Sequence, residues 1–225
     1  MQKIVLANWK ANLTPERAMQ WCDAFAATYQ PCVDIEVVLA VPAFLLERVA
    51  EKTRKLAGVA LAAQGVSPYP QGSYTGSLPA AWLRGLVKYA LVGHQERRRY
   101  FHESVQDVAR QVYESLTEEL QPIVCIDREV LVAQAAAMAI EELSKLMWAY
   151  TPATPVALEM ARDEAEISSM MVQIAKKTDN RPVLYGGGVT VANGRSVLQL
   201  PGVSGILLGQ GCLDARAFAG FISQL

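Results

Sequence analysis

Residues 3–41 read KIVLANWKANLTPERAMQWCDAFAATYQPCVDIEVVLAV and set the fold class. The stretch opens with an apolar, β-branched run, Lys3–Ala7, which is typical of a strand buried on both faces. Thr14 and Pro15 then suit the N-cap and the first position of a helix. A second apolar run, Ile35–Val41, follows that helix. Strand, helix and strand in this order predict a parallel pair, because parallel neighbours need a crossover connection.

The same alternation continues to the end of the chain. Further apolar runs, each expected to form a strand, are Val59–Ala63, Tyr89–Val92, Pro122–Ile126, Met147–Tyr150, Pro182–Tyr185 and Gly205–Leu208. The segments expected to be helical are Ala43–Lys55, Leu78–Leu86, Ser104–Glu118, Val130–Leu143, Arg162–Lys177 and Ala215–Ile222. An open, doubly wound sheet is the alternative architecture, but eight units without a break in composition favour closure. We therefore expect residues 1–225 to form a single (β/α)8 barrel domain, at about 28 residues per unit.

The composition excludes several classes of protein. Twenty-one basic and 22 acidic side chains nearly cancel, whereas a nucleic-acid binder normally carries a basic excess. No charge-free apolar run reaches the roughly 18 residues of a membrane span, and the amino-terminal residues do not resemble a secretion signal.

The cysteines form no Cys-x-x-Cys pair, which predicts reduced thiols in a cytoplasmic protein; they are Cys22, Cys32, Cys125 and Cys212. Only two histidines are present, which argues against a histidine metal centre. We expect most of the tryptophans to lie in the core: Trp9, Trp21, Trp82 and Trp148.

In a (β/α)8 barrel, the residues that follow the strands carry the chemistry. Lys10 follows the first strand and could hold an anion or a developing oxyanion, or could be a solvated strand-end lysine. His94 follows the fourth strand as an acid, a base or a neutral donor, or as a histidine that bonds only to backbone. Glycine clusters at 186–188 and 209–211 follow the last two strands. One such cluster would suit a tight turn, but two at these strand ends favour a phosphate site.

These strand-end motifs together resemble the triosephosphate isomerase family. The matching pieces, in family order from the first strand to the last, are Asn8-Trp9-Lys10, Ala63-Gln64, Ser67-Pro68, Tyr74-Thr75-Gly76, Val92-Gly93-His94-x-Glu96-Arg97-Arg98-x-Tyr100-Phe101, Pro122-Ile123-Val124-Cys125-Ile126, Ala149-Tyr150-x-Pro152, Tyr185-Gly186-Gly187 and Leu208-Gly209. Each piece is weak alone, and the combination is specific.

The resemblance implies a (β/α)8 barrel that interconverts dihydroxyacetone phosphate and glyceraldehyde 3-phosphate without a cofactor or a metal. By this resemblance, Lys10 is the electrostatic clamp on the substrate oxygens, with Asn8 beside it. His94 is the neutral group that polarises the carbonyl, a role that the family pairs with a carboxylate base. Glu96 lies close to the lysine, and Cys125 packs behind the catalytic base.

The resemblance also implies binding partners. Backbone groups hold the substrate phosphate, and the positions concerned are Gly187, Gly188, Gly209 and Gln210. The loop around Thr75 enters a neighbouring subunit, which gives a homodimer or a higher oligomer. The expected small-molecule partner is a phosphorylated metabolite or another anion, with no nucleic acid and no membrane among the partners.

The position of the family's general base departs from the pattern. Members have Ala-Tyr-Glu-Pro after the sixth strand, whereas this chain has Ala149-Tyr150-Thr151-Pro152. Removing a proton from carbon needs a group whose pKa lies near the working pH, and a threonine hydroxyl does not ionise there. A general base contributes on the order of 10²–10⁴-fold to the rate, so Thr151 predicts a severe loss.

The lid and the phosphate site depart as well. The segment 152–159 has no glycine, and Pro155 stiffens it. Gln95 replaces the family serine beside the histidine, and Gln210 places a side chain where backbone should approach phosphate. Asp127-Arg128 replaces a Gly-Glu pair of the family.

Three functions follow from these matches and departures. The expected one is an isomerase homologue that is inactive or very weak and binds a small phosphorylated metabolite. The first alternative is a working isomerase, for triose phosphate or a related sugar phosphate, whose base is another carboxylate such as Glu159 or Glu96. The second alternative is a non-catalytic interaction protein whose Thr75 loop matters more than its pocket.

Overall fold

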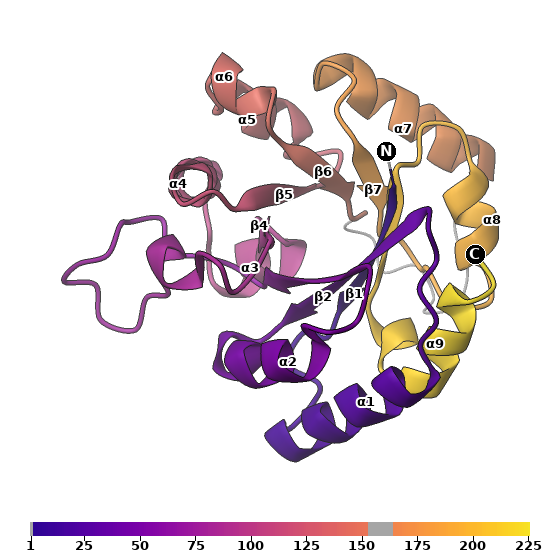
Figure 1. The fold of residues 1–225 in the computed structure, drawn as a ribbon. Helices are drawn as coiled ribbons and strands as arrows, with labels where there is room; N and C mark the ends of the chain where they lie inside the picture. The colour runs from indigo at the N-terminus through magenta and orange to yellow at the C-terminus, as the bar shows by residue number, and fades with distance from the viewer. Residues whose placement is uncertain (1, 153–163) are drawn as a thin grey trace.

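The computed structural model describes residues 2–152 and 164–225, whose strands close into one barrel (Figure 1). The strands are β1 (Lys3–Asn8), β2 (Ile35–Val41), β3 (Val59–Ala63), β4 (Tyr89–Val92), β5 (Gln121–Ile126), β6 (Met147–Tyr150), β7 (Val183–Tyr185) and β8 (Gly205–Leu208). Each strand pairs in parallel with the next, and β8 pairs with β1 through Ile4 and Gly205. The closed order confirms the expected barrel and excludes the open sheet.

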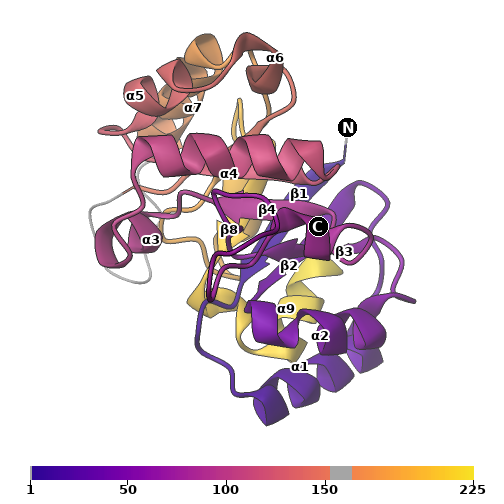
Figure 2. The ribbon, with the colours of Figure 1, turned by 90° about the vertical axis from the view of Figure 1, so that its left-hand side faces the viewer.

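Helices surround the barrel and cover the outer faces of its strands (Figures 1 and 2). The α-helices are α1 (Pro15–Thr28), α2 (Leu46–Thr53), α3 (Gln95–Tyr100), α4 (Val105–Thr117), α5 (Leu131–Ala136), α6 (Ile140–Leu143), α7 (Glu164–Lys177), α8 (Gly194–Gln199) and α9 (Ala215–Ile222). Short 3₁₀ turns are η1 (Ala43–Leu45), η2 (Ala80–Leu83) and η3 (Gln210–Cys212). None of the helices within the described ranges has the length and apolarity that crossing a bilayer requires.

The core has two layers because side chains alternate along each strand. Ile4 and Leu6 belong to a buried cluster made only of strand residues, which fills the barrel interior. Val5 and Ala7 belong to the larger cluster between the barrel and its helices. The apolar runs in the sequence are nearly continuous because both faces of each strand are buried.

The segment 130–143 is not the single helix that the sequence predicts. It divides into α5 and α6, with Ala139 in an extended conformation between them. Met138 packs into the core, and the Ala139 N–H donates to the Glu142 carboxylate at 2.8 Å, which starts the second helix. Burial of one side chain and a new cap together outweigh the helix propensity of the alanines.

Two further expectations are corrected. Segment 78–86 contains only the η2 turn, because Pro79 is extended and Gly85 has a φ of +75°. Segment 43–55 begins with the η1 turn and becomes α-helical only at Leu46. Most of the tryptophans lie in the core, as expected: Trp9, Trp21 and Trp148 are buried, whereas Trp82 in η2 is 61% exposed.

Two remaining expectations concern the cysteines and the lid. All four cysteines are free thiols, as predicted. The predictions about Pro155 and Glu159 in the lid concern residues outside the described ranges, as does the start of the predicted helix at Arg162.

Candidate functional site

The loop after β1 holds Lys10 in a constrained backbone conformation. Lys10 has a φ of +50°, which is uncommon for a residue with a side chain. Its N–H donates to the Asn8 Oδ1 at 3.1 Å. The Gln64 amide, from the end of β3, donates to the Lys10 and Ala40 carbonyls at 3.2 and 2.9 Å. The ends of β1, β2 and β3 are therefore tied together beneath the lysine.

The Lys10 ammonium forms an ion pair with Glu96, the second residue of α3. Nζ lies 2.5 Å from Oε1, and the two side chains are 35% and 40% exposed. The other oxygen of Glu96 lies 3.6 Å from the Nδ1 of His94. The structure thus brings together three residues that the sequence singled out, from the ends of two strands on opposite sides of β2 and β3.

His94 caps the start of α3 and is 6% exposed. Its Nδ1 accepts a hydrogen bond from the Glu96 N–H at 3.2 Å. Burial lowers the pKa of His94 to about 4; the Glu96 carboxylate opposes this shift and the Lys10 ammonium adds to it. At neutral pH the ring is therefore neutral, and because Nδ1 is an acceptor its single proton is on Nε2. Such a ring can donate to a carbonyl oxygen but is a poor proton donor to water.

Thr151 lies at the end of β6 and is 2% exposed. Its N–H donates to the Ile126 carbonyl at 2.8 Å, and its hydroxyl is 3.5 Å from the same oxygen. Its methyl group packs near Gly186, because a Cβ on that glycine would lie 3.0 Å from it. Thr151 is thus a buried neutral side chain at the strand end expected to carry the base.

The carboxylates that follow the described strands, and that could replace the missing base, have other partners. Glu96 is held by Lys10. Asp127, after β5, accepts from the N–H groups of Glu129 and Val130 at 2.9 Å each and so caps the turn that follows it. Glu159 lies outside the described residues.

The glycine that follows β8 lies beside this site, because β8 pairs with β1. A Cβ on Gly209 would lie 3.7 Å from Cε of Lys10, so the lysine stem passes over that glycine. Gly187 packs against Pro152 and the ring of Tyr185, and a Cβ there would clash at 2.6 Å. Gly188 has a φ of +63°, which suits glycine. Gln210 follows Gly209 with an exposed side chain.

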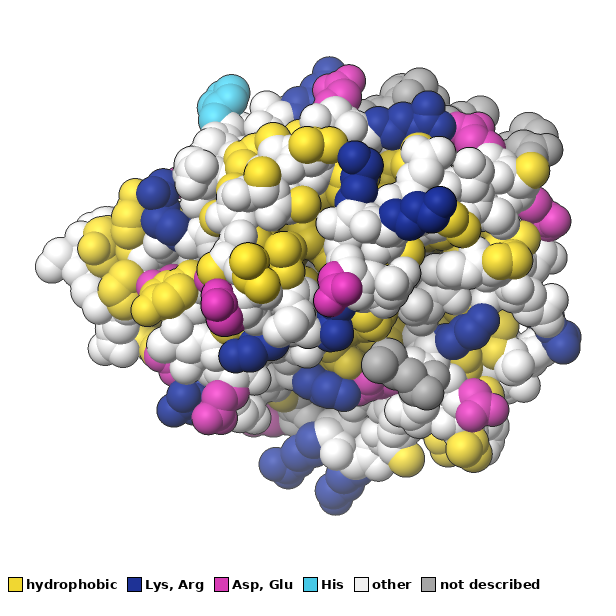
Figure 3. Space-filling view, turned by 90° about the horizontal axis from the view of Figure 1, so that it is seen from above, with side chains coloured by type: hydrophobic (Ala, Val, Ile, Leu, Met, Phe, Trp, Pro, Cys, Tyr) yellow, Lys and Arg dark blue, Asp and Glu magenta, His cyan; other side chains and the backbone are white. Residues whose placement is uncertain are grey.

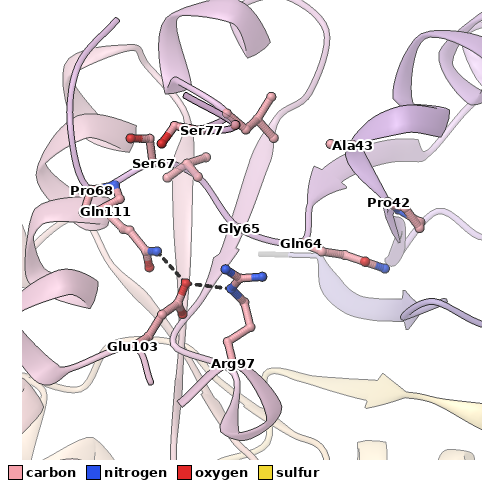
Figure 4. Close-up of a pocket in the computed structure, with 13 residues that line it drawn as sticks. Pro42, Ala43, Gln64, Gly65, Ser67, Pro68, Ser77, Arg97, Glu103 and Gln111 are labelled. Atoms are coloured by element: carbon pink, nitrogen blue, oxygen red, sulfur yellow. Dashed lines mark hydrogen bonds and ion pairs between the residues drawn. The ribbon is translucent and has the colours of Figure 1, made fainter. Parts of the chain in front are cut away.

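Thr75 lies apart from this cluster, exposed on the loop between β3 and β4 that projects at the left of Figure 1. A cavity of about 410 Å³ opens at the base of this loop (Figure 4). Within it, Arg97 and Gln111 both point at Glu103 and donate to its Oε1 at 2.6 and 2.9 Å. Seen from above, hydrophobic side chains gather on the same side of the molecule (Figure 3). Exposed aromatic residues lie on this loop (Tyr69 and Tyr74), in η1 (Phe44) and at the end of α3 (Tyr100 and Phe101).

Comparison with known proteins gives the family of this chain. The family model for triosephosphate isomerase matches residues 3–225. The chain belongs to the triosephosphate isomerase family. It is 30% identical to the triosephosphate isomerase of Mesomycoplasma hyorhinis, over 96% of this chain and 95% of that protein. It is 29% identical to that of Francisella philomiragia and 27% identical to that of Francisella tularensis subsp. mediasiatica, over 100% of this chain and 97% of each relative.

Two residues of this candidate site were not singled out from the sequence for a role of their own. Gln64 appeared there only as part of a motif, yet its amide braces the Lys10 loop. Arg98 likewise appeared only within the motif after the fourth strand, yet it bonds the ends of two strands. Gln64 directly follows β3, and that position was its available signal, whereas Arg98 lies inside α3. Most of their bonding partners come from distant segments and leave no local pattern.

Proposed function

We propose that this chain is a triosephosphate isomerase homologue that has kept the pocket which polarises a carbonyl and has lost the general base. In this view it binds a small phosphorylated metabolite or another anion, and its turnover of dihydroxyacetone phosphate is absent or very low. The observation that carries the proposal is Thr151, a buried neutral residue whose N–H donates to the Ile126 carbonyl and whose hydroxyl lies 3.5 Å from the same oxygen.

The groups retained in the pocket support ligand binding. Lys10 supplies a cation and His94 supplies a neutral N–H donor, so both complement oxygen atoms of a carbonyl or an anion. Backbone at Gly187, Gly188 and Gly209 supports phosphate binding, with the Gln210 side chain restricting the approach. No cofactor or metal enters this proposal.

The missing step is proton removal from carbon. In the family reaction a proton leaves the carbon beside the carbonyl while negative charge develops on the carbonyl oxygen, which His94 and Lys10 would stabilise. Thr151 cannot accept that proton, because a threonine hydroxyl is not ionised at neutral pH and is a very weak base. Stabilisation of the oxygen alone leaves the proton without an acceptor.

The direct test compares turnover of dihydroxyacetone phosphate by the wild type, Thr151→Glu and the uncharged control Thr151→Gln. We expect Thr151→Glu to exceed both of the others by at least about tenfold, which is a part of the roughly 10²–10⁴-fold value of a general base. Wild-type turnover equal to that of an ordinary isomerase would contradict the proposal and favour another carboxylate.

Binding is tested separately by calorimetry with dihydroxyacetone phosphate and with inorganic phosphate. We expect binding to the wild type and at least tenfold weaker binding to Lys10→Met, because that change removes the cation and keeps the stem. Absence of binding to the wild type would favour the non-catalytic interaction protein instead.

We also propose that residues 1–225 form a single domain that associates as a homodimer or a higher oligomer through the loop around Thr75, in the cytoplasm. The support is the projecting loop beside a cavity of about 410 Å³ on the same face, with exposed aromatic side chains around both. A projecting loop and a cavity on one face suit a two-fold interface, in which the loop of each copy fills the cavity of the other.

A further inference from the structure

Arg98 lies on α3 with its guanidinium partly buried between strands rather than paired with an acid. Nε donates to the Gly93 carbonyl at 2.7 Å, and Nη2 donates to the Cys125 carbonyl at 3.3 Å and to Gln134 Oε1 at 2.8 Å. In the described part of the chain, no carboxylate oxygen lies within the 4.0 Å of an ion pair with this group. Burial lowers the pKa of Arg98 from its ordinary value. The hydrogen bonds of the guanidinium must therefore offset the desolvation cost of its charge.

Two of the groups that accept hydrogen bonds from Arg98 are backbone carbonyls at the ends of the neighbouring strands β4 and β5. Gly93 follows β4 and precedes His94, while Cys125 lies in β5 just before Ile126, whose carbonyl binds Thr151. Gln134 on α5 is fully buried and passes the connection on to the Val105 carbonyl at 3.1 Å. One guanidinium thus connects the end of β4, the end of β5 and two helices.

Packing at Gly93 makes the connection rigid. Gly93 has a φ of +66°, and a Cβ there would lie 2.7 Å from Nη2 of Arg98 and 3.1 Å from Val108. The guanidinium therefore occupies the space that a side chain at position 93 would take. The peptide that leads into His94 cannot rotate without breaking the bond from Arg98 or clashing with it.

We propose that Arg98 is a positioning residue for His94. By holding the Gly93 carbonyl, it fixes the ring in the orientation in which Nδ1 accepts from the Glu96 N–H and Nε2 carries the proton toward the pocket. A guanidinium suits this role because its donors point in fixed directions toward separate strands, which a lysine ammonium does not match. The inference goes beyond the proposed function and does not depend on it, since it concerns the ligand-free protein.

The test is nuclear magnetic resonance of ¹⁵N-histidine in the ligand-free full chain. The chain has two histidines, and the exposed His102 provides an internal reference four residues from Arg98. In the wild type we expect the His94 ring to show an acceptor Nδ1, a protonated Nε2 and a pKa of about 4. In Arg98→Ala we expect a mixture of tautomers and a pKa displaced toward the ordinary value near 6.5, with the His102 signals unchanged.

The matched control is Arg97→Ala, which removes the same side chain one position earlier in α3, where it contacts Glu103 instead. We expect this control to leave the His94 ring signals as in the wild type. Added guanidinium ion should restore the wild-type His94 signals in Arg98→Ala, whereas urea, a neutral molecule of similar shape, should not.

Three results would overturn the proposal: wild-type His94 signals in folded Arg98→Ala, an equal change in Arg97→Ala, or an equal change at His102. If Arg98→Ala does not fold, Arg98→Lys decides the question with the same spectra. A changed His94 tautomer in that variant supports the proposal, and an unchanged one contradicts it.

Discussion

His94 is neutral because its surroundings oppose a charge. Burial is the largest influence on its pKa, and the nearby ammonium of Lys10 acts in the same direction. The Glu96 carboxylate opposes both but is itself paired with Lys10, which reduces its effect on the ring. A histidine in this state is suited to donating one hydrogen bond at neutral pH rather than to exchanging protons.

This state makes the stability of the fold depend on pH. The folded-state pKa of about 4 lies below the unfolded value near 6.5, so the unfolded chain binds more protons between these values. The contribution of His94 is complete above about pH 6.5 and is lost as pH falls through about 4. We expect about 2 kcal/mol of stability to be lost from this source between pH 7.5 and pH 5, measured by urea denaturation. His94→Gln should lose measurably less over that interval, and an equal loss in the two proteins would contradict the assignment.

The helices depend on local caps in addition to packing against the barrel. α4 begins with a reciprocal pair, in which the Ser104 hydroxyl accepts from the Asp107 N–H at 3.1 Å and the Asp107 carboxylate accepts from the Ser104 N–H at 3.0 Å. Hydrogen bonds from Ser104 lower the pKa of Asp107 to about 2. The cap is thus intact above the ordinary carboxyl pKa and is lost as pH falls through about 2.

Removing this cap should destabilise the protein without affecting the site. We expect Ser104→Ala to lower the free energy of unfolding by about 1 kcal/mol, because the Asp107 N–H in the first turn loses its acceptor. Gln106→Ala, at an exposed position of α4 itself, is the control and should change it by less than about 0.5 kcal/mol. A loss no larger than in the control would show that the cap adds nothing to the packing of α4.

Among the secondary-structure elements, the sequence predicts the strands better than the helices. The apolar run at 3–7 identifies β1 to within a residue, since burial on both faces leaves a continuous pattern. The break at Ala139 depends on a core position for Met138, and the short α3 at Gln95–Tyr100 depends on His94 as its cap. In the site, Lys10, His94 and Glu96 were predicted as neighbours from the family resemblance. The role of Arg98 was not predicted, because its three partners lie on segments up to 36 residues away.

The whole barrel depends on the seam where β8 meets β1. A Cβ on Gly205 would lie 2.4 Å from the Ile4 carbonyl and 3.0 Å from Leu184, so the two strands meet at a position that admits only glycine. Strand neighbours at this point are fixed on both sides and cannot move apart without opening the sheet. The seam is therefore sensitive to the smallest added side chain.

Gly205→Ala should lower the free energy of unfolding by about 3 kcal/mol, the upper part of the range for overpacking. Gly220→Ala is the matched control, because the space beside that α9 glycine is open and alanine is the better helix former. We expect the control to be neutral or stabilising by up to about 1 kcal/mol. Urea denaturation of both variants measures the difference, and equal stabilities would contradict the account of the seam.

The proposed association is also a property of the whole molecule. Replacing residues 70–76 by a short Gly-Ser linker should convert the oligomer into a monomer, as measured by sedimentation velocity. Val132→Ser, which alters an exposed apolar side chain on α5, should leave the mass unchanged. An unchanged mass after the loop replacement would show that other surfaces hold the copies together, and a monomeric wild type would contradict the association itself.

Closure between the first and last strands also has a consequence for biosynthesis. While a ribosome is still making the chain, β1 has β2 on one side and an open edge on the other, because its second partner, Gly205–Leu208, is translated near the end. Unpaired edges invite contacts between nascent chains. A message truncated before codon 205 would therefore yield a product with two open edges, which we expect to be a substrate for chaperones and proteases rather than a smaller folded protein.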